Sequence, residues 1–357
     1  MGARNANGSD PSRARRLLKR AAWRTLYPRW RGGTDAAEGY TILIPVPGDL
    51  PVFTHLALAG LARQDPDGRT EIIVIPDRST PDFASTLAQS AALFPPGVVR
   101  PARIGARARA IQRVSGDPSL NHFFQLFHGI TAARTKYAVL HDVDLFINDV
   151  GFLAERYRRC RDDGLACLGL ELVFNDEWYE RHGLGPVLAT WELMFEIDWL
   201  RAFPPWQAHL HYRNVNGGVH MFDTMDYPQV HIPSERRRLA EAPDAFVHFR
   251  QVITVFRRFQ LADGRPYEDV RFRLLLIRLL MDAFGGSDSR LPPPPVDELA
   301  RGITDASAPV TYRSPGIEAN YSSFRLMLGF VTAGPLVDPD RAERIERALA
   351  PFDAAFG

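Results

Sequence analysis

Cysteine, lysine and long apolar runs are all scarce in this chain of 357 residues. Cys160 and Cys167 are the only cysteines, too few for a disulfide framework and without the Cys/His spacing of a zinc site. No stretch approaches the roughly 18–20 apolar residues that span a bilayer, and the N-terminus lacks the apolar core of a signal peptide. We therefore expect a reduced, cytoplasmic setting.

The charge balance excludes few functions, but it bears on whether the partner is a nucleic acid. Only Lys19 and Lys136 are lysines, so nearly all positive charge is arginine, and the formal net charge is +1. Such a balance gives no reason to expect a nucleic-acid partner. Hydrophobic and charged contents of 45% and 24% are typical of a globular chain, and the length suits one large α/β domain or two smaller ones.

Residues 1–38 form a basic arm in which arginines alternate with apolar side chains. One interpretation is an amphipathic segment that contacts anionic lipid, which would make the protein peripheral at the inner face of the membrane. The other, which we favour, is a segment that packs its apolar side on the main domain. The apolar side chains concerned are Leu17, Leu18, Trp23, Leu26 and Trp30.

From Tyr40 onward, short apolar runs alternate with segments of helical spacing. This alternation predicts an α/β fold with a mostly parallel sheet and helices on both of its faces. The expected strands are residues 40–46, 70–77, 97–104 and 137–147. The expected helices are residues 52–65, 79–94, 119–134 and 150–164, with a further strong helix at 267–284. A proline-rich linker and a helical tail are expected to follow.

Two aspartates, Asp142 and Asp144, interrupt the apolar run "YAVLHDVDLFI". Residues two apart in a strand point to the same face, and ligands of α/β proteins bind at the carboxyl ends of strands. Two adjacent carboxylates repel each other unless a cation or protons intervene. Oxygen ligands favour Mg²⁺ or Mn²⁺, which leave positions open for phosphate oxygens. Taken alone, such a pair is also common in surface turns.

Three segments in order resemble the nucleotide-sugar-binding half of a GT-A-fold glycosyltransferase of the family 2 type. They are "TILIPVPGDLPVFTHLALAGLARQ", "EIIVIPDRSTPDF" and "FHGITAARTKYAVLHDVDLFI". The resemblance implies a GT-A-like fold, a hexosyltransferase activity that is metal-dependent and inverting, a nucleoside diphosphate sugar donor, and a glycan or small-molecule acceptor. It also implies a donor-binding half at 39–150 and an acceptor-binding half of the same domain at 151–285; the proline-rich composition separately predicts a linker with helical tail at 286–357.

Carried over residue by residue, the resemblance places Pro45 beside the nucleotide and lets Asp77 accept hydrogen bonds from the base. Asp142 and Asp144 would reach the metal and the diphosphate. The alternative for Asp77 is a turn former or helix cap.

The chain also departs from the family pattern. His128, expected near the nucleotide, stands where the family often has asparagine, and Arg78 where it often has glycine. Arg134, like Arg103, Arg107 and Arg109, is expected to add a charge-assisted hydrogen bond to phosphate. For the arginines of residues 102–113 the alternative is a solvated arginine face.

Candidates in the second half each have an ordinary alternative. The resemblance implies His248 as a third metal ligand, and the alternative is a core histidine. Gly217 with Gly218 is expected as a loop near the sugar or as a hairpin turn. For the base that deprotonates the acceptor, the sequence offers Asp269, which resembles the family's acidic pair, and its rival Glu192. The alternative for Asp269 is a first-turn acid that complements a helix dipole.

Two other classes stay in competition with the transferase. A GT-A-like binding or scaffold protein would keep the fold without turnover, although it has no physical need for two repelling carboxylates. A phosphatase of the haloacid dehalogenase type also places D-x-D after an apolar strand. Here Leu145 follows the second aspartate and no later lysine is present, which disfavours the phosphatase. The Gly-rich, Arg-containing first loop of sugar-phosphate nucleotidyltransferases is absent as well.

Overall fold

A seven-stranded sheet forms the centre of the computed structural model, with the strands in the order β10-β6-β7-β4-β1-β2-β3. The strands are β1 Ala37–Pro47, β2 Arg69–Asp77, β3 Val99–Pro101, β4 Thr135–Leu140, β6 Cys167–Gly169, β7 Leu193–Glu196 and β10 Arg237–Leu239. Only β7 is antiparallel to its neighbours in this sheet. The structure describes residues 24–25, 27–30, 36–102, 104–106, 108–110, 118–173, 176–209, 211–215, 218–241 and 244–357.

The central strand β1 is buried on both of its faces. Ile42 and Ile44 belong to one hydrophobic core, whereas Leu43 between them belongs to another. A strand covered on both faces has a continuous apolar run rather than an alternating pattern, which is why "YTILIPV" is apolar throughout. The expected α/β class with a mostly parallel sheet is confirmed.

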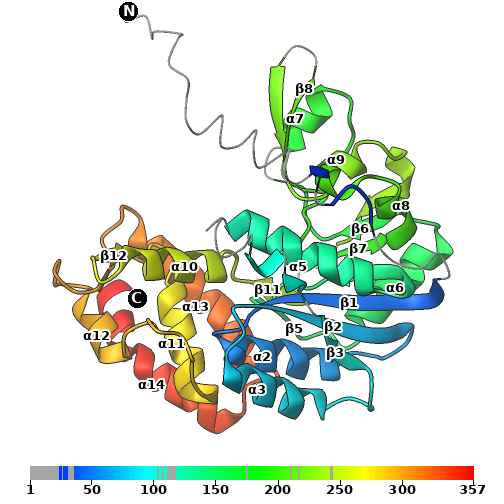
Figure 1. Cartoon of the computed structure of the whole chain (residues 1–357). Helices are drawn as coiled ribbons and strands as arrows, with labels where there is room; N and C mark the ends of the chain where they lie inside the picture. Colours follow the sequence, from blue (N-terminus) through cyan, green and yellow to red (C-terminus); the bar gives the residue numbers. More distant parts are fainter. Residues whose placement is uncertain are drawn as a thin grey trace, which may run out of the picture.

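Helices cover the two faces of the sheet as separate layers (Figure 1). Helices α2 Pro51–Ala62, α3 Pro81–Ala91 and α6 Phe152–Asp162 pack in the core that contains Ile42. Helices α5 Pro118–Ala132 and α8 Ile197–Arg201 pack in the core that contains Leu43. Both α2 and α3 begin with a proline at the first helical position, where the missing N–H costs no hydrogen bond.

The predicted strand 137–147 is in fact two strands in two different sheets. β4 ends at Leu140, and β5 Leu145–Ile147 pairs antiparallel with β11 Phe246–His248. The last ladder bond is donated by the His141 N–H to the Leu43 carbonyl at 2.9 Å. Beyond it the chain turns, and Asp142 and Asp144 lie in the connection rather than on a strand.

Shorter elements surround the end of the sheet near β6 and β7. They are α7 Asp176–Arg181, η1 Pro205–Gln207, the antiparallel pair β8 His211–Val215 and β9 Gly218–Phe222, α9 Asp226–Gln229 and η2 Ser234–Arg236. Residues 184–203 contain strand β7 and the short helix α8.

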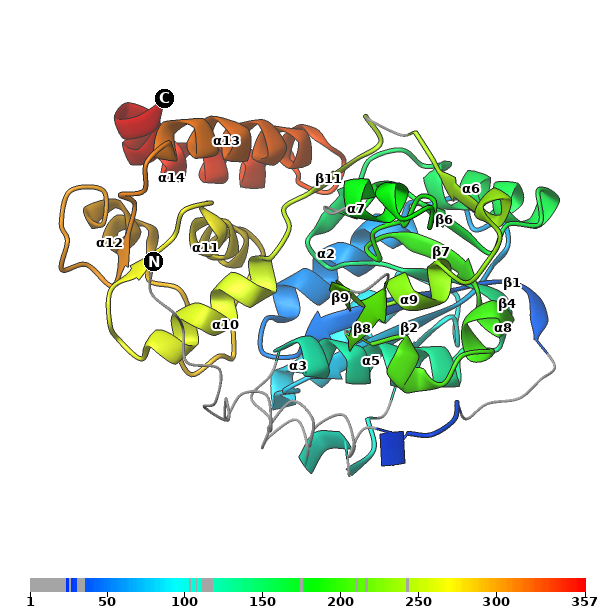
Figure 2. The same ribbon diagram turned by 90° about the horizontal axis from the view of Figure 1, so that it is seen from above.

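The C-terminal third is helical, as expected, and gathers to one side of the sheet (Figure 2). Its elements are α10 Val252–Ala262, β12 Tyr267–Glu268, α11 Arg273–Phe284, α12 Val296–Arg301, β13 Val310–Thr311, α13 Ile317–Ala333 and α14 Pro339–Phe356. Phe272 at the start of α11 is fully buried and stacks on Tyr312 with ring centroids 5.0 Å apart. These helices share one continuous core with α2 and β1.

Part of the basic arm packs on the domain. The Trp30 ring stacks on Phe127 of α5 with centroids 5.3 Å apart, and its indole N–H donates to the Phe203 carbonyl at 2.6 Å. Tyr27 makes an edge contact with the same Phe127 ring at 4.7 Å. For these residues the packing interpretation is confirmed; Leu17, Leu18, Trp23 and Leu26 lie outside the described residues. Among the described residues no helix is both long and apolar enough to cross a membrane.

Candidate metal and nucleotide site

Asp142 and Asp144 lie at the carboxyl edge of the sheet, directly after β4. The Asp144 side chain is nearly buried, with 8% of its surface exposed, whereas Asp142 keeps 29%. The Val252 N–H at the start of α10 donates to Asp144 Oδ2 at 3.2 Å, and the Phe249 N–H donates to the Asp144 carbonyl at 3.0 Å. Asp144 is therefore fixed by backbone donors from a segment that is distant in sequence.

His248 is brought to this pair by the β5–β11 ladder, in which it lies opposite Leu145. Its Nε2 is 3.2 Å from Asp144 Oδ1 and 3.6 Å from Asp142 Oδ2. One ligand atom from each of the three residues lies within 4.8 Å of the others. Two carboxylates and one imidazole on one side of an ion leave its other positions open, which suits a divalent ion that also binds phosphate.

The pKa values of Asp142, Asp144 and His248 are shifted by burial and by the opposite charges of their neighbours. Burial raises the pKa of Asp142, and the nearby His248 opposes that shift. Burial also acts to raise the pKa of Asp144, but His248 and the Val252 N–H outweigh it and hold this pKa below its ordinary value. For His248 burial lowers the pKa, and the attraction of Asp144 outweighs burial, so the net shift is upward. The group therefore favours positive charge between the carboxylates, whether a proton or a metal ion supplies it.

Glu192 lies in the protein interior next to His141, away from any open surface. Its side chain is fully buried, and its Oε2 is 2.7 Å from Nδ1 of His141, the residue before Asp142. The Arg156 guanidinium donates to the Glu192 carbonyl at 2.6 Å, and Glu192 adopts a left-handed φ of 51°. A base must reach the acceptor hydroxyl, so this burial argues against Glu192 as the base and for a role in orienting His141.

Asp269 caps a helix in the protein interior. It is 1% exposed, and its carboxylate accepts the N–H groups of Arg273 at 2.8 Å, Leu274 at 2.9 Å and Leu275 at 3.4 Å. Burial raises the pKa of Asp269 to about 6, although these N–H groups act in the opposite direction. Asp269 precedes α11 rather than lying in its first turn, but its carboxylate accepts the first N–H groups of this helix, in line with the helix-dipole alternative.

The residues expected around the nucleotide divide into those at the carboxyl edge and those away from it. Pro45 lies near the end of β1, and Asp77 ends β2, so both lie at the edge that carries Asp142. Arg134 precedes the first residue of β4 at the opposite edge and is exposed, so the structure separates it from this group. His128 is half-buried on α5.

The expected glycine loop is only partly described. Gly218 begins strand β9, which pairs antiparallel with β8 through Val215. Gly217 lies outside the described residues. What is described of this loop therefore matches the hairpin alternative.

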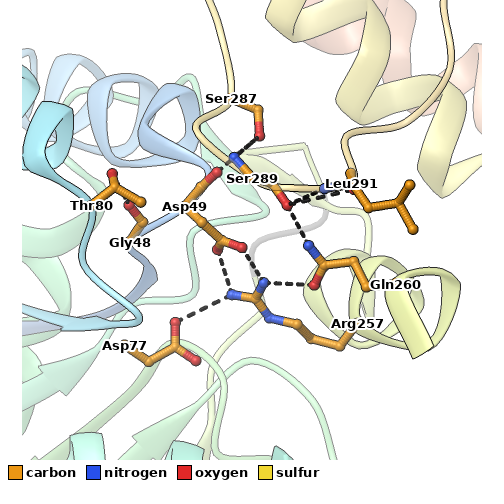
Figure 3. Close-up of polar contacts among 9 residues, drawn as sticks. All are labelled: Gly48, Asp49, Asp77, Thr80, Arg257, Gln260, Ser287, Ser289 and Leu291. Atoms are coloured by element: carbon orange, nitrogen blue, oxygen red, sulfur yellow. Dashed lines mark hydrogen bonds and ion pairs between the residues drawn. The ribbon is translucent and has the colours of Figure 1, made fainter. Parts of the chain in front are cut away.

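Two residues beside Asp77 were missed from the sequence. Arg257 of α10 donates to both carboxylate oxygens of Asp49, at 2.5 and 2.6 Å, and is 3.4 Å from Asp77 Oδ1 (Figure 3). Asp49 follows Gly48 in the loop after β1, and Arg257 is one of several arginines in an amphipathic stretch. Because Asp49 and Arg257 are 208 residues apart, no local pattern indicates that they pair.

Glu171 is a second feature that the sequence did not indicate. It lies two residues beyond β6, and its carboxylate pairs with Arg250 at 2.5 Å while keeping 38% of its side chain exposed. The Arg250 guanidinium lies 5.7 Å from the Trp191 ring centroid, and Trp191 lies 4.6 Å from the His248 ring. Glu171 is thus a solvent-accessible carboxylate linked to His248 through the side chains of Arg250 and Trp191.

Comparisons with known proteins give structural likeness only. No protein-family model and no curated protein matches the chain. TarS from S. aureus, residues 1–349, is 12% identical over 89% of this chain and 89% of that one, with a TM-score of 0.39. The mannosyltransferase PcManGT from Pyrobaculum calidifontis, in complex with GDP-Man and Mn²⁺, is 15% identical over 96% of this chain and 83% of that one, with a TM-score of 0.34.

A third structure is glucosyl-3-phosphoglycerate synthase from Mycobacterium tuberculosis, in complex with Mn²⁺, UDP and glucosyl-3-phosphoglycerate. It is 14% identical over 59% of this chain and 66% of that one, with a TM-score of 0.33. Because these TM-scores lie below 0.5, we rest the function on this chain's own sheet topology and side chains.

Proposed function

We propose that this protein is a metal-dependent glycosyltransferase that moves a sugar from a nucleoside diphosphate sugar to an acceptor hydroxyl, with inversion at the sugar. The observation that carries the proposal is the convergence of Asp142, Asp144 and His248 at the carboxyl edge of a mostly parallel sheet. Ligands of such sheets bind at that edge. Asp77 ends the adjoining strand β2 at the same edge and provides a carboxylate for the nucleoside.

The three side chains fit Mn²⁺ or Mg²⁺ by donor type and spacing. When bound, the ion supplies Lewis acidity to the diphosphate leaving group. The Val252 N–H holds the Asp144 carboxylate and the Phe249 N–H holds its backbone carbonyl, so Asp144 needs little rearrangement to bind an ion. Asp142 is the more exposed carboxylate of the pair.

For the base that inversion requires, we propose Glu171. Both carboxylates expected from the sequence, Glu192 and Asp269, are buried. Glu171 keeps solvent access and pairs with Arg250, whose guanidinium lies near the Trp191 ring; Trp191 in turn contacts His248. In the transfer step, a Glu171 oxygen takes the proton of the acceptor hydroxyl. The acceptor oxygen bonds to the anomeric carbon as the bond from that carbon to the diphosphate breaks.

The test is a thermal-shift and donor-hydrolysis screen over UDP, GDP and dTDP nucleotides and their sugars, with and without Mn²⁺. Selective binding to the folded state raises the unfolding temperature, so stabilisation that requires both Mn²⁺ and a diphosphate is expected. Asp144→Ala should abolish it, whereas Asp198→Asn, at an exposed carboxylate on α8, should not change it. A nucleotide response that persists in Asp144→Ala contradicts the metal assignment.

A GT-A-like binding protein without turnover is the second candidate. The burial of Glu192 and Asp269 favours it, because both carboxylates that the sequence offered for proton transfer are enclosed. Metal-dependent nucleotide binding with no hydrolysis or transfer for any sugar nucleotide would support this candidate over the transferase.

A further inference from the structure

Helix α10 connects two ends of the proposed donor site. At its first residue, the Val252 N–H binds Asp144 Oδ2 of the metal group. Arg257 is five residues further along, about 7.5 Å at 1.5 Å per residue. There its guanidinium meets Asp49 and Asp77, which follow β1 and end β2 (Figure 3). Helix α10 therefore contacts both the proposed metal ligand Asp144 and the proposed nucleoside-binding residue Asp77.

Arg257 and its two carboxylates are almost enclosed. The exposed fractions of the side chains are 7% for Arg257, 10% for Asp49 and 13% for Asp77. The paired bonds to Asp49 use the planar geometry that makes arginine–carboxylate contacts strong and directional. Burying such charges is costly unless each is paired. Two carboxylates share one guanidinium, so Asp77 keeps acceptor capacity that the pair with Asp49 does not use.

The loops that follow β1 and β2 approach each other closely beside this cluster. A Cβ at Gly48 would lie 2.4 Å from the Asp77 carbonyl oxygen, so only glycine allows the two loops to approach this closely. The Thr80 hydroxyl donates to the Gly48 carbonyl at 3.1 Å, and the Ser287 hydroxyl donates to the Asp49 carbonyl at 3.0 Å. The side chain of Asp49 is thereby presented to Arg257 from a fixed backbone.

On Arg257 itself, Nη1 also donates to Gln260 Oε1, one turn further along α10, at 2.9 Å. The Gln260 amide in turn donates to the Ser289 hydroxyl. The guanidinium is thus held from both sides and has few alternative positions.

We propose that Arg257 is a positioning residue for nucleobase recognition, which is anchored by Asp49 and orients the Asp77 carboxylate as an acceptor for a ring N–H. The inference rests on the proposed function. A carboxylate accepts hydrogen bonds only. It therefore favours bases that carry a ring N–H at neutral pH, as uracil, thymine and guanine do, over adenine and cytosine, which do not. Burial raises the pKa of Asp77 and Arg257 opposes that shift, so Arg257 helps to keep the acceptor ionised.

The experiment measures dissociation constants by calorimetry for MnCl₂, for Mn²⁺ with pyrophosphate, and for Mn²⁺ with UDP, GDP, ADP and CDP. For the wild type, UDP or GDP should bind more tightly than ADP and CDP. In Arg257→Gln the dissociation constant of the preferred nucleotide should rise about 10- to 100-fold, the range for a lost charged hydrogen bond. Binding of Mn²⁺ and of Mn²⁺–pyrophosphate should stay within about twofold, because the metal group is unchanged.

Arg258→Gln is the matched control, since Arg258 is the next residue on α10 and is exposed. It should bind every probe like the wild type. Asp49→Asn should weaken nucleotide binding in the same sense as Arg257→Gln. If Arg257 acts through Asp77, the double variant Arg257→Gln/Asp77→Asn should bind nucleotide no more weakly than Asp77→Asn alone.

The outcomes separate the two proposals. A wild type that binds no nucleotide with Mn²⁺ overturns the proposed function, and this inference with it. A wild type that binds nucleotide while Arg257→Gln binds equally well overturns the inference alone. Loss of both Mn²⁺ and nucleotide binding in Arg257→Gln, or full additivity in the double variant, assigns Arg257 to general support of the fold and also overturns the inference.

Discussion

The candidate residues at the sheet edge differ in the exposure of their side chains, and the roles that we propose for them follow this difference. Asp144 and His248 are nearly enclosed and suit a ligand role, whereas Glu171 is open to solvent and suits proton transfer. Asp144 and Glu171 both carry a carboxylate, and we assign them different roles because their exposure differs.

Glu171→Gln should lower kcat for sugar transfer by about 100-fold or more, in line with the usual contribution of a general base. Donor binding with Mn²⁺ should stay unchanged, because Glu171 is not among the metal ligands. The measurement is steady-state transfer kinetics together with donor titration. Equal kcat values for the variant and the wild type would remove Glu171 from the reaction.

Asp226 is expected to make stability depend on pH. It is 2% exposed, and its Oδ2 accepts the Tyr179 hydroxyl at 2.9 Å. Burial, with the nearby Asp223 charge, raises its pKa to about 7, against about 3.9 in an unfolded chain. Between these values the folded state holds a proton that the unfolded state has released, so this contribution to stability is present below about pH 4 and is lost as pH rises through 7.

Asp226→Asn should therefore gain stability relative to the wild type between pH 5 and pH 8, by on the order of 1–3 kcal/mol. Chemical denaturation at the two pH values measures the difference. Asp198→Asn, at an exposed position, serves as the control. A constant difference between Asp226→Asn and the wild type over this range would contradict the shifted pKa.

At the scale of elements, the C-terminal helices are held by an aromatic core rather than by the sheet ladder. Phe352 of α14 is fully buried, with ring centroids 5.4 Å from Tyr312 and 6.4 Å from Phe272. Phe272 in turn begins α11, which is buried almost all round. Through these ring contacts, α14 packs against the start of α11, the helix whose first N–H groups donate to Asp269.

Phe352→Ala should lower the free energy of unfolding by about 3–5 kcal/mol, the usual cost of removing a fully buried ring. Leu326→Ala on α13 removes an apolar side chain that is 79% exposed, and its cost should stay within about 0.5 kcal/mol. Denaturant titration measures both, and Mn²⁺ binding by folded Phe352→Ala should match the wild type. A cost below about 1 kcal/mol for Phe352→Ala would mean that this core is loosely packed.

At the scale of the whole molecule, local pattern predicted the elements well and long-range contacts poorly. The strands around Leu43 and Ile73 were predictable because continuous apolar runs mark a sheet covered on both faces. The end of β4 at Leu140 was not, because the next apolar run, at β5, belongs to a second sheet. The order of the strands agrees with the predicted class and was not itself derived from the sequence.

The same limit applies to the candidate site. Asp142 and Asp144 were found because they are neighbours in sequence, and His248 because the family resemblance indicated it. The burial of Glu192 and Asp269 depends on partners such as His141 and the first turn of α11, and no single-sequence pattern reports such partners. The pairing of Asp49 with Arg257 joins residues that are 208 positions apart.

The segment between α11 and α12 has a practical consequence for anyone who modifies this protein. Its composition is that of a spacer, yet the Thr80 hydroxyl donates to Asp288 at 2.6 Å, and Ser287 bonds to the loop after β1. A spacer can be lengthened or cut with little effect, but this one is hydrogen-bonded to the loops that carry the proposed nucleoside-binding residues. Insertions, tags or domain junctions placed at residues 286–289 are therefore expected to alter nucleotide selectivity, and safer positions for them lie elsewhere on the surface.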